Sequence, residues 1–270
     1  MKIDAVIGNP PYNNDMYIPF VEMGHQLSTD CSLFITPAKW QAKGGEKNEA
    51  FRQNIVPHMS KIVYYPDETD IFDIVSYGGI TYYLIDKHNV YKQKQIENIS
   101  SRVNGFNNIT ERELCWILNN IGSSVVSKIN DSRLYIDRFS QDKMYKVALS
   151  KLLLWSGHSK YLYTTDGHTS VLSIPEIIEG EYEDNKRIAY SSDNKAEAES
   201  FSSFVKTKFI RFLILVGSFT QSTAVSNETW RFVPDPGTFD HIFTDEELYK
   251  KYNLTEEEIN IIESVIKERK

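Results

Sequence analysis

The first ninety residues alternate between short apolar segments and segments with helical spacing, and this alternation limits the folds open to the chain. Strands are predicted at 2–7, 31–37, 61–67 and 78–87, and helices at 17–28 and 46–56. The order strand, helix, strand, helix, strand is typical of a parallel α/β sheet. We therefore expect an α/β fold here, with the carboxyl ends of the strands at one edge of the sheet.

Beyond residue 90 the pattern changes to short β-like pieces and longer helical ones. The segment 194–218 is the longest helical candidate, and two amphipathic helices follow it. Thr255 and Glu258 form a T-x-x-E capping box before the second of these. We expect three regions, with the first boundary near 90–105: an α/β region 1–95, an α+β region 105–235 and an acidic helical tail 236–270.

The distribution of charge matters more than the net charge of −7. Residues 235–270 hold ten acidic and five basic residues, or −10 + 5 = −5, so the other residues sum to −7 + 5 = −2. An acidic tail thus accompanies a nearly neutral body. Local basic patches are possible in that body, and the net charge does not exclude nucleic acid as a partner.

The cysteine content and the lack of long apolar runs indicate an intracellular protein. Cys31 and Cys115 are too few for a disulfide framework or a thiolate metal site. The six histidines show no pair at metal-ligand spacing, so no metal is expected. No apolar run approaches the ~20 residues that span a bilayer, and no signal-peptide pattern occurs. We expect no membrane partner.

The first predicted strand ends in Asn-Pro-Pro-Tyr, residues 9–12. Pro10 and Pro11 lack N–H donors and hold φ near −65°, so the strand cannot continue and the backbone is rigid. The Asn9 side-chain oxygen and the Pro10 carbonyl are then two fixed acceptors, which suit an NH2 group. Tyr12 offers a face for a planar ring. The corner is therefore predicted to hold an aromatic amine at the edge where open α/β sheets bind ligands.

The segment "DAVIGNPPY" resembles the catalytic motif of N6-adenine DNA methyltransferases, written [DNS]-P-P-[YFW]. "SLFITPAKW" and "DIFDIVSYGGITYYLID" resemble the catalytic half of large restriction–modification enzymes whose target-recognition region lies C-terminal, and "WRFVP" resembles their terminal segment. The resemblance covers residues 1–90 and 200–270. It implies a partial Rossmann-like methyltransferase sheet, made of the later strands only, followed by an α+β target-recognition region with C-terminal helices.

The resemblance also implies S-adenosyl-L-methionine as the methyl donor, with Asn9 and Pro11 beside it, and double-stranded DNA as the substrate. The family's cofactor half would precede residue 1, and no GxG turn occurs in the chain. We therefore expect a fragment or split subunit, completed by an N-terminal methyltransferase segment or subunit that pairs with the open edge of the sheet. The expected location is the bacterial cytoplasm, for a bacterial or phage-encoded protein.

Three other interpretations stay open. The chain could be a truncated gene product, or a catalytically inactive remnant that binds DNA or a protein. It could also keep the fold and methylate another acceptor, such as a glutamine amide or an RNA base.

The family's catalytic chemistry maps onto four residues of this corner and its surroundings. Hydrogen bonds from both N6 hydrogens to Asn9 and Pro10 would localise the nitrogen lone pair and stabilise developing positive charge. Tyr12 would stack on the base flipped from the duplex. Phe72 is the best match for an aromatic side chain on the other face of the base, and Tyr77 is its competitor.

Basic side chains in several segments are candidates for contacts with DNA phosphates. They are Lys39 after the second strand, Lys206, Lys208 and Arg211 in the helix 194–218, and Arg231 in "TWRFVP". The competing interpretation for each is an ordinary solvated side chain.

Overall fold

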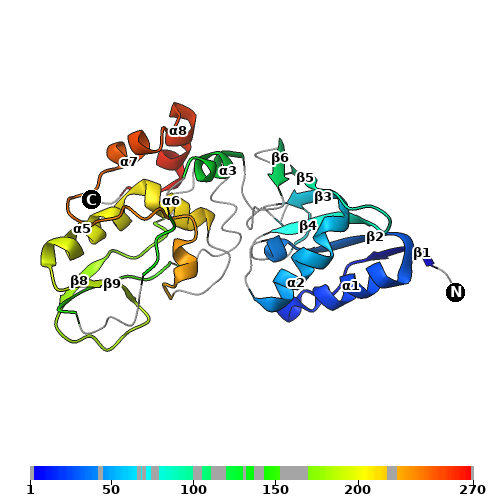
Figure 1. Cartoon of the computed structure of the whole chain (residues 1–270), viewed down its shortest axis with the longest axis horizontal. Helices are drawn as coiled ribbons and strands as arrows, with labels where there is room; N and C mark the ends of the chain where they lie inside the picture. The colour runs from blue at the N-terminus through cyan, green and yellow to red at the C-terminus, as the bar shows by residue number, and fades with distance from the viewer. Residues whose placement is uncertain are drawn as a thin grey trace. The chain divides into compact units, whose positions relative to one another are not determined.

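The computed structural model consists of two compact units (Figure 1). The structure describes residues 3–41, 45–65, 68, 71–73, 79–99, 105–110, 120–129, 132–136, 143–152, 170–217 and 224–268. Unit 1 holds the described residues up to Asn120, and unit 2 holds the described residues from Ile121 onward. The boundary region predicted near 90–105 thus lies inside unit 1, and the tail 236–270 belongs to unit 2.

Unit 1 is built on a six-stranded sheet with the order β1-β2-β4-β3-β5-β6. Its strands are β1 (Ile3–Gly8), β2 (Ser28–Pro37), β3 (Met59–Tyr65), β4 (Ile80–Asp86), β5 (Gln93–Asn98) and β6 (Gly105–Thr110). β1 pairs with β2 in parallel, β3 pairs with β5 in parallel, and β4 runs antiparallel between β2 and β3. β6 is antiparallel to β5. The α/β class is confirmed, and the sheet is mixed because the fourth predicted strand reverses direction.

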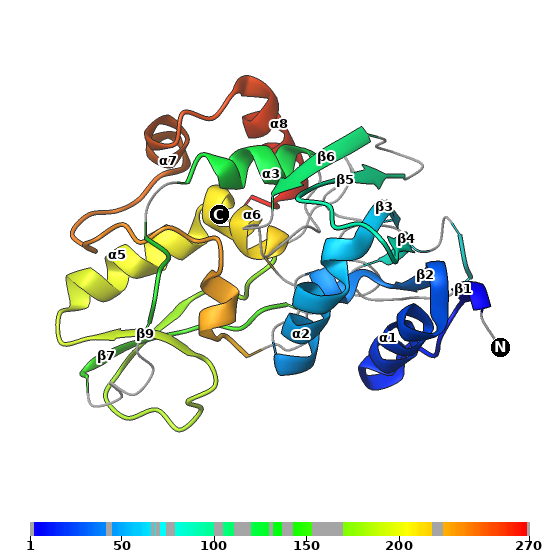
Figure 2. The ribbon, with the colours of Figure 1, turned by 45° about the vertical axis from the view of Figure 1, so that its right-hand side comes forward.

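Two helices, α1 (Tyr17–Leu27) and α2 (Glu46–Asn54), lie side by side on one face of this sheet (Figure 2). The ring of Phe51 on α2 meets Tyr17 of α1 at 6.3 Å and Tyr83 of β4 at 6.4 Å, between ring centroids. Gly24 lets α1 approach the sheet, since a Cβ there would lie 2.4 Å from the Phe34 ring of β2. These contacts form the core of unit 1.

The edge of the sheet at β1 carries exposed apolar side chains. β1 has β2 as its single neighbour in the described sheet, and Ile7 is 77% exposed. On the outer face of α1, Met16, Phe20, Met23 and Leu27 are 41–53% exposed. Their spacing of four, three and four residues places them in one row along the helix. We call these four residues the α1 stripe.

Unit 2 combines a small antiparallel sheet with helices. The strands are β7 (Tyr145–Ala148), β8 (Glu176–Glu179) and β9 (Ile188–Ser192), in the order β8-β7-β9, and the helices are α3 (Asn120–Ser127), α5 (Lys195–Lys206), α6 (Lys208–Val216), α7 (Asp245–Lys251) and α8 (Glu256–Val265). α5 packs on this sheet, where Phe201 stacks on Tyr190 of β9 with 4.6 Å between ring centroids. No helix in the described part of the chain is long and apolar enough to cross a membrane.

The helix predicted over 194–218 is wrong as a single element, because it breaks at Thr207. This residue is extended, with ψ 148°, and its hydroxyl accepts a hydrogen bond from Ile210 N at the start of α6. The capping box predicted at Thr255 and Glu258 is confirmed at the start of α8. The break sets α6 apart from α5 and lets its amino end meet α7.

Candidate active site at residues 9–12

The corner predicted at residues 9–12 follows the last residue of β1. Gly8 is required there by a close approach, since a Cβ would lie 2.9 Å from the Phe34 ring. Asn9 and Pro11 are exposed, whereas Pro10 between them is buried. Within the described part of the chain, no hydrogen bond occupies the side-chain amide of Asn9. The corner is thus anchored through Pro10 and leaves the Asn9 amide accessible.

Tyr12 is half-buried, and its hydroxyl is the buried end of the side chain. Burial raises the pKa of this phenol, and the oxygen has no hydrogen-bond partner within the described part of the chain. The neighbouring Tyr83 hydroxyl, whose pKa burial also raises, accepts a hydrogen bond of 3.2 Å from Thr36 Oγ1. Both phenols therefore stay neutral at physiological pH. The tip of the Tyr12 side chain is therefore buried, while part of the side chain remains accessible.

A short 3-10 turn, η1 (Asn13–Asp15), connects the corner to α1. Asn14 and Asp15 have φ of 49° and 62°, in the left-handed region. Such a conformation costs roughly 1–2 kcal/mol for most residues and is adopted most readily by glycine, Asn and Asp. Asp15 is buried, and its carboxylate forms an ion pair of 2.9 Å with Lys39 Nζ, a charge contact that lacks the angular geometry of a hydrogen bond. Sequence reasoning missed Asp15; the signal was the Asn-Asn-Asp run, which favours left-handed turns.

Lys39 lies in η2 (Ala38–Gln41), the turn that directly follows β2. Its side chain is 23% exposed, and its ammonium also lies 5.8 Å from the centroid of the Tyr17 ring. The predicted position at the same edge as the corner is therefore found. However, this ammonium faces a buried carboxylate and a ring instead of extending into solvent.

The other predicted residues of unit 1 are less closely tied to the corner. Phe72 is half-exposed in a turn, where its N–H donates to the Glu68 carbonyl at 2.8 Å. Its predicted contact with the base stays a prediction. Tyr77 lies outside the described residues.

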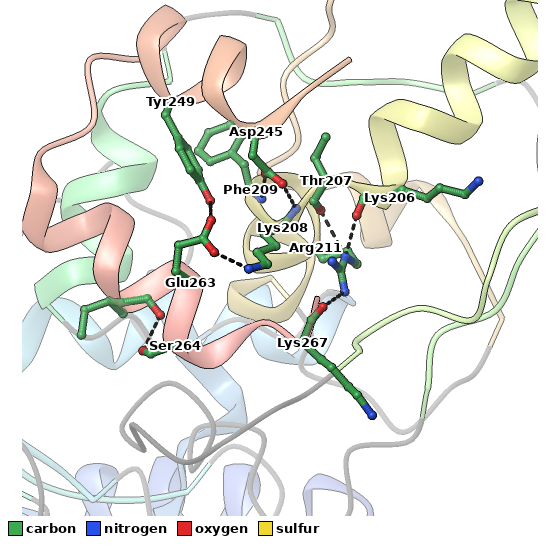
Figure 3. A network of polar contacts seen from close by, with 11 residues as sticks. Lys206, Thr207, Lys208, Phe209, Arg211, Asp245, Tyr249, Glu263, Ser264 and Lys267 are labelled. Carbon is green, nitrogen blue, oxygen red and sulfur yellow. Dashed lines mark hydrogen bonds and ion pairs between the residues drawn. The ribbon is translucent and has the colours of Figure 1, made fainter. Parts of the chain in front are cut away.

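Arg211 of unit 2 does not have the exposure that a phosphate contact requires. Its side chain is 1% exposed, and its guanidinium donates to the carbonyls of Lys206 and Thr207, at 3.0 and 3.2 Å, and of Lys267, at 2.7 Å (Figure 3). These bonds hold the start of α6 against the end of the chain. The geometry therefore argues against the predicted phosphate contact and gives Arg211 a structural role.

The remaining basic candidates differ in accessibility. Lys208 forms an ion pair with Glu263, and its side chain is 16% exposed. Lys206 is exposed, and Arg231 is half-buried. Lys206 is thus the unit 2 candidate whose side chain is exposed.

A pocket of about 600 Å³ lies in unit 2, and it contains none of the predicted site residues. Its lining comes from residues 134–136, 190–197 and 235–240, and includes the carboxylates of Glu197 and Asp235. Negative charge there disfavours a phosphate backbone. The pocket is therefore no candidate for a DNA contact.

Comparison with protein families gives one match, to the Eco57I restriction-modification methylase family, over residues 12–72. The match runs from Tyr12 through α1, β2, α2 and β3 to Phe72, and it covers less than a quarter of the 270 residues. This segment of the chain is thus similar to a restriction–modification methylase. A comparison with curated proteins gives no match.

Comparison with solved structures gives restriction–modification proteins with low overall similarity. One is from a study of complex assembly and conformational transition of the type I R-M system (15% identity, TM-score 0.30, 36% of this chain and 24% of that chain). Another is the ATP-dependent Type ISP restriction-modification enzyme LlaBIII bound to DNA (15% identity, TM-score 0.34, 56% of this chain and 15% of that chain). A third is the type IIG restriction endonuclease BpuSI (15% identity, TM-score 0.32, 54% of this chain and 20% of that chain). The chain spans at most 24% of the length of these proteins.

Proposed function

We propose that this chain carries the catalytic corner of a site-specific DNA methyltransferase that acts on adenine N6 in a restriction–modification system. The main support is the corner itself: an accessible Asn9 amide, a buried Pro10 and a half-buried Tyr12 whose hydroxyl is the buried end of its side chain. The methylase-family match that begins at Tyr12 adds to it.

The acceptor chemistry follows from the two oxygens of the corner. Asn9 and the Pro10 carbonyl accept hydrogen bonds from the two N6 hydrogens, which localises the lone pair on nitrogen. The same oxygens stabilise the positive charge that develops there in the transition state. The rigid corner keeps them in place, so little reorganisation is needed when the reaction occurs.

The base and the duplex require further contacts. A flipped adenine needs an aromatic platform, and we propose Tyr12 on one face and Phe72 on the other. The exposed Lys206 and the half-buried Arg231 are the proposed phosphate contacts of unit 2. Phosphate contacts position the duplex and do not read its sequence.

The described corner does not by itself offer the groups that S-adenosylmethionine requires. When bound, the cofactor would supply the methyl group, and we propose that Asn9 and Pro11 would border it. Asp15 is the acidic residue of the segment 9–17. Because its carboxylate is buried and paired with Lys39, it does not reach ribose hydroxyls. We therefore propose that the remaining cofactor groups come from a complementing methyltransferase segment or subunit.

The edge at β1 is the proposed docking position for that complement. β1 is an apolar strand of the kind found inside sheets, yet its outer edge is unpaired in the described sheet. Ile7 of β1 and the α1 stripe both expose apolar surface in this part of unit 1. Exposed apolar surface of this kind marks interaction sites. An added strand parallel to β1 would bring its carboxyl end beside Asn9.

The test measures transfer of a labelled methyl group from S-adenosylmethionine to adenine-containing duplex DNA. The chain is assayed alone and with a polypeptide from the neighbouring open reading frame that carries a glycine-rich methyltransferase half. We expect transfer with the complement only. Transfer by the chain alone would contradict the need for a complement. DNA binding with no transfer under either condition would favour the inactive remnant.

A further inference from the structure

The ion pair between Asp15 and Lys39 joins the turn after the corner to the end of the neighbouring strand. The two residues are 24 positions apart in the sequence, and their charged groups lie 2.9 Å apart. We propose that Lys39 and Asp15 are a positioning pair, which fixes the Asn9–Tyr12 corner in the geometry needed for transfer. This inference rests on the proposed function, and it assigns Lys39 a role other than phosphate binding.

The Lys39 end of the pair is held by the core. The next residue, Trp40, is fully buried, and its indole N–H donates to Thr81 Oγ1 on β4 at 3.1 Å. The Trp40 carbonyl accepts a hydrogen bond of 2.6 Å from Arg52 on α2. The backbone next to Lys39 is therefore held, and its ammonium lies between the Asp15 carboxylate and the Tyr17 ring.

The Asp15 end of the pair lies next to the corner. Asp15 is buried in a left-handed conformation, and Met16 N donates to the Asn13 carbonyl at 2.9 Å, which closes the turn. The following residue, Tyr17, is fully buried, and burial and the nearby Asp15 carboxylate both raise the pKa of its phenol. Because two residues separate Asp15 from Tyr12, any shift of the carboxylate moves the turn that carries the stacking ring.

Charge and strain make this turn dependent on the pair. Two successive left-handed residues are unfavourable unless surrounding contacts enforce them. A cation beside Asp15 stabilises the carboxylate in its buried position. Removal of the cation weakens that hold, so the turn relaxes and the acceptor oxygens leave their alignment with the amine. Loss of alignment reduces the rate of transfer and leaves the surface that binds the duplex unchanged.

The test compares Lys39→Met, Asp15→Asn and the double variant with the wild-type chain. Lys39→Arg keeps the cation and should rescue the loss. Lys61→Met is the matched control, because Lys61 also forms an ion pair in unit 1, with Glu97 at 3.8 Å, but its side chain is 60% exposed. The first readout is hydrogen exchange at the amides of Tyr12 to Tyr17, which requires no activity. The second is transfer by the complemented chain and its affinity for duplex DNA at several salt concentrations.

We expect faster hydrogen exchange at the amides of Tyr12–Tyr17 in Lys39→Met and Asp15→Asn. The exchange rate should not change in Lys61→Met. Transfer at saturating DNA should fall about 100-fold, the effect of a misplacement of about 1 Å. The double variant should lose no more than either single variant, and DNA affinity and its salt slope should not change.

Unchanged exchange in Lys39→Met, together with a salt slope reduced by about one, would overturn the inference and establish Lys39 as a phosphate contact. If the complemented wild-type chain transfers no methyl group, the proposed function fails. The exchange data then still decide whether the pair holds the corner.

Discussion

The β1–α1 region of unit 1 and the α6–α8 region of unit 2 differ in whether their polar and apolar side chains contact other parts of the protein or face solvent. In unit 2, the carboxylate of Asp245 accepts hydrogen bonds from Lys208 N and Phe209 N at 3.0 and 2.9 Å, and the Tyr249 hydroxyl donates to Glu263 at 2.9 Å (Figure 3). Charged side chains there are used to hold helices together. In unit 1, the amide of Asn9 and the α1 stripe face outward.

This difference indicates where the molecule meets its partners. A region whose polar groups bond to one another gains stability and offers little for recognition. A region with a rigid corner, an accessible amide and an exposed apolar row has groups available for binding. We therefore propose that unit 1 carries the chemistry and the assembly contact, and that the α6–α8 region has mainly structural roles.

The largest stability effect is expected from Arg211→Met in unit 2. The change removes a buried guanidinium that bonds to the carbonyls of Lys206, Thr207 and Lys267. Loss of charged hydrogen bonds in a buried site should lower the free energy of unfolding by about 3 kcal/mol, measured by urea denaturation. Lys206→Met, at an exposed side chain, should change it by less than about 0.5 kcal/mol. Unchanged stability in Arg211→Met would remove the contrast between the two regions.

A smaller and pH-dependent effect is expected from Glu258→Gln. The buried carboxylate accepts hydrogen bonds from Lys128, Ser124 and the Thr255 N–H, at 2.6 to 2.7 Å. Burial acts to raise the pKa of Glu258, but the bonds from Lys128, Ser124 and Thr255 outweigh it, and the pKa lies below its ordinary value of 4.5. Its stabilisation is therefore present above the unfolded pKa and is lost as the pH falls through the lowered folded pKa.

Glu258→Gln should thus lower the free energy of unfolding by about 2 kcal/mol at pH 7, and by much less at pH 3. Urea denaturation at both pH values measures this difference. Glu257→Gln is the control, at an exposed neighbour on the same helix. An equal loss at both pH values would show that the charge of Glu258 contributes nothing.

The smallest effect is expected at the α1 stripe. Met23 is 50% exposed, whereas Ile18 on the opposite face of α1 is 3% exposed. Met23→Ala should change the free energy of unfolding of the isolated chain by less than about 0.5 kcal/mol, and Ile18→Ala should lower it by at least about 2 kcal/mol. The same Met23 variant should weaken binding of the complementing polypeptide, measured by calorimetry. A large loss of intrinsic stability in Met23→Ala would show that the stripe is part of the core.

Features set by local backbone chemistry were predictable from the sequence. The prolines at 10 and 11 end β1 whatever surrounds them, and the apolar periodicity located α1, α2 and the first four strands. The capping box before α8 depends on two residues three apart, and it was also found.

Features set by distant contacts were not predictable. The break at Thr207 interrupts an apolar run that reads as one helix, and it is stabilised by Asp245, 38 residues further along the chain. Leu27 matches the helical spacing of α1 but is 53% exposed, because periodicity does not tell which apolar face is covered. The ion-pair partner of Lys39 and one hydrogen-bond partner of Arg211, Lys267, lie far away in the sequence.

Nucleoside analysis of methylated DNA tests the central claim most directly. Duplex DNA is incubated with labelled S-adenosylmethionine and the complemented chain, as wild type, Asn9→Ala or Asn13→Ala, the last being an exposed asparagine in the following turn. We predict N6-methyladenine from the wild type and Asn13→Ala, and a fall of about 100- to 1,000-fold in Asn9→Ala at unchanged DNA affinity. Equal N6-methyladenine from Asn9→Ala, or methylation at another atom, would contradict the account.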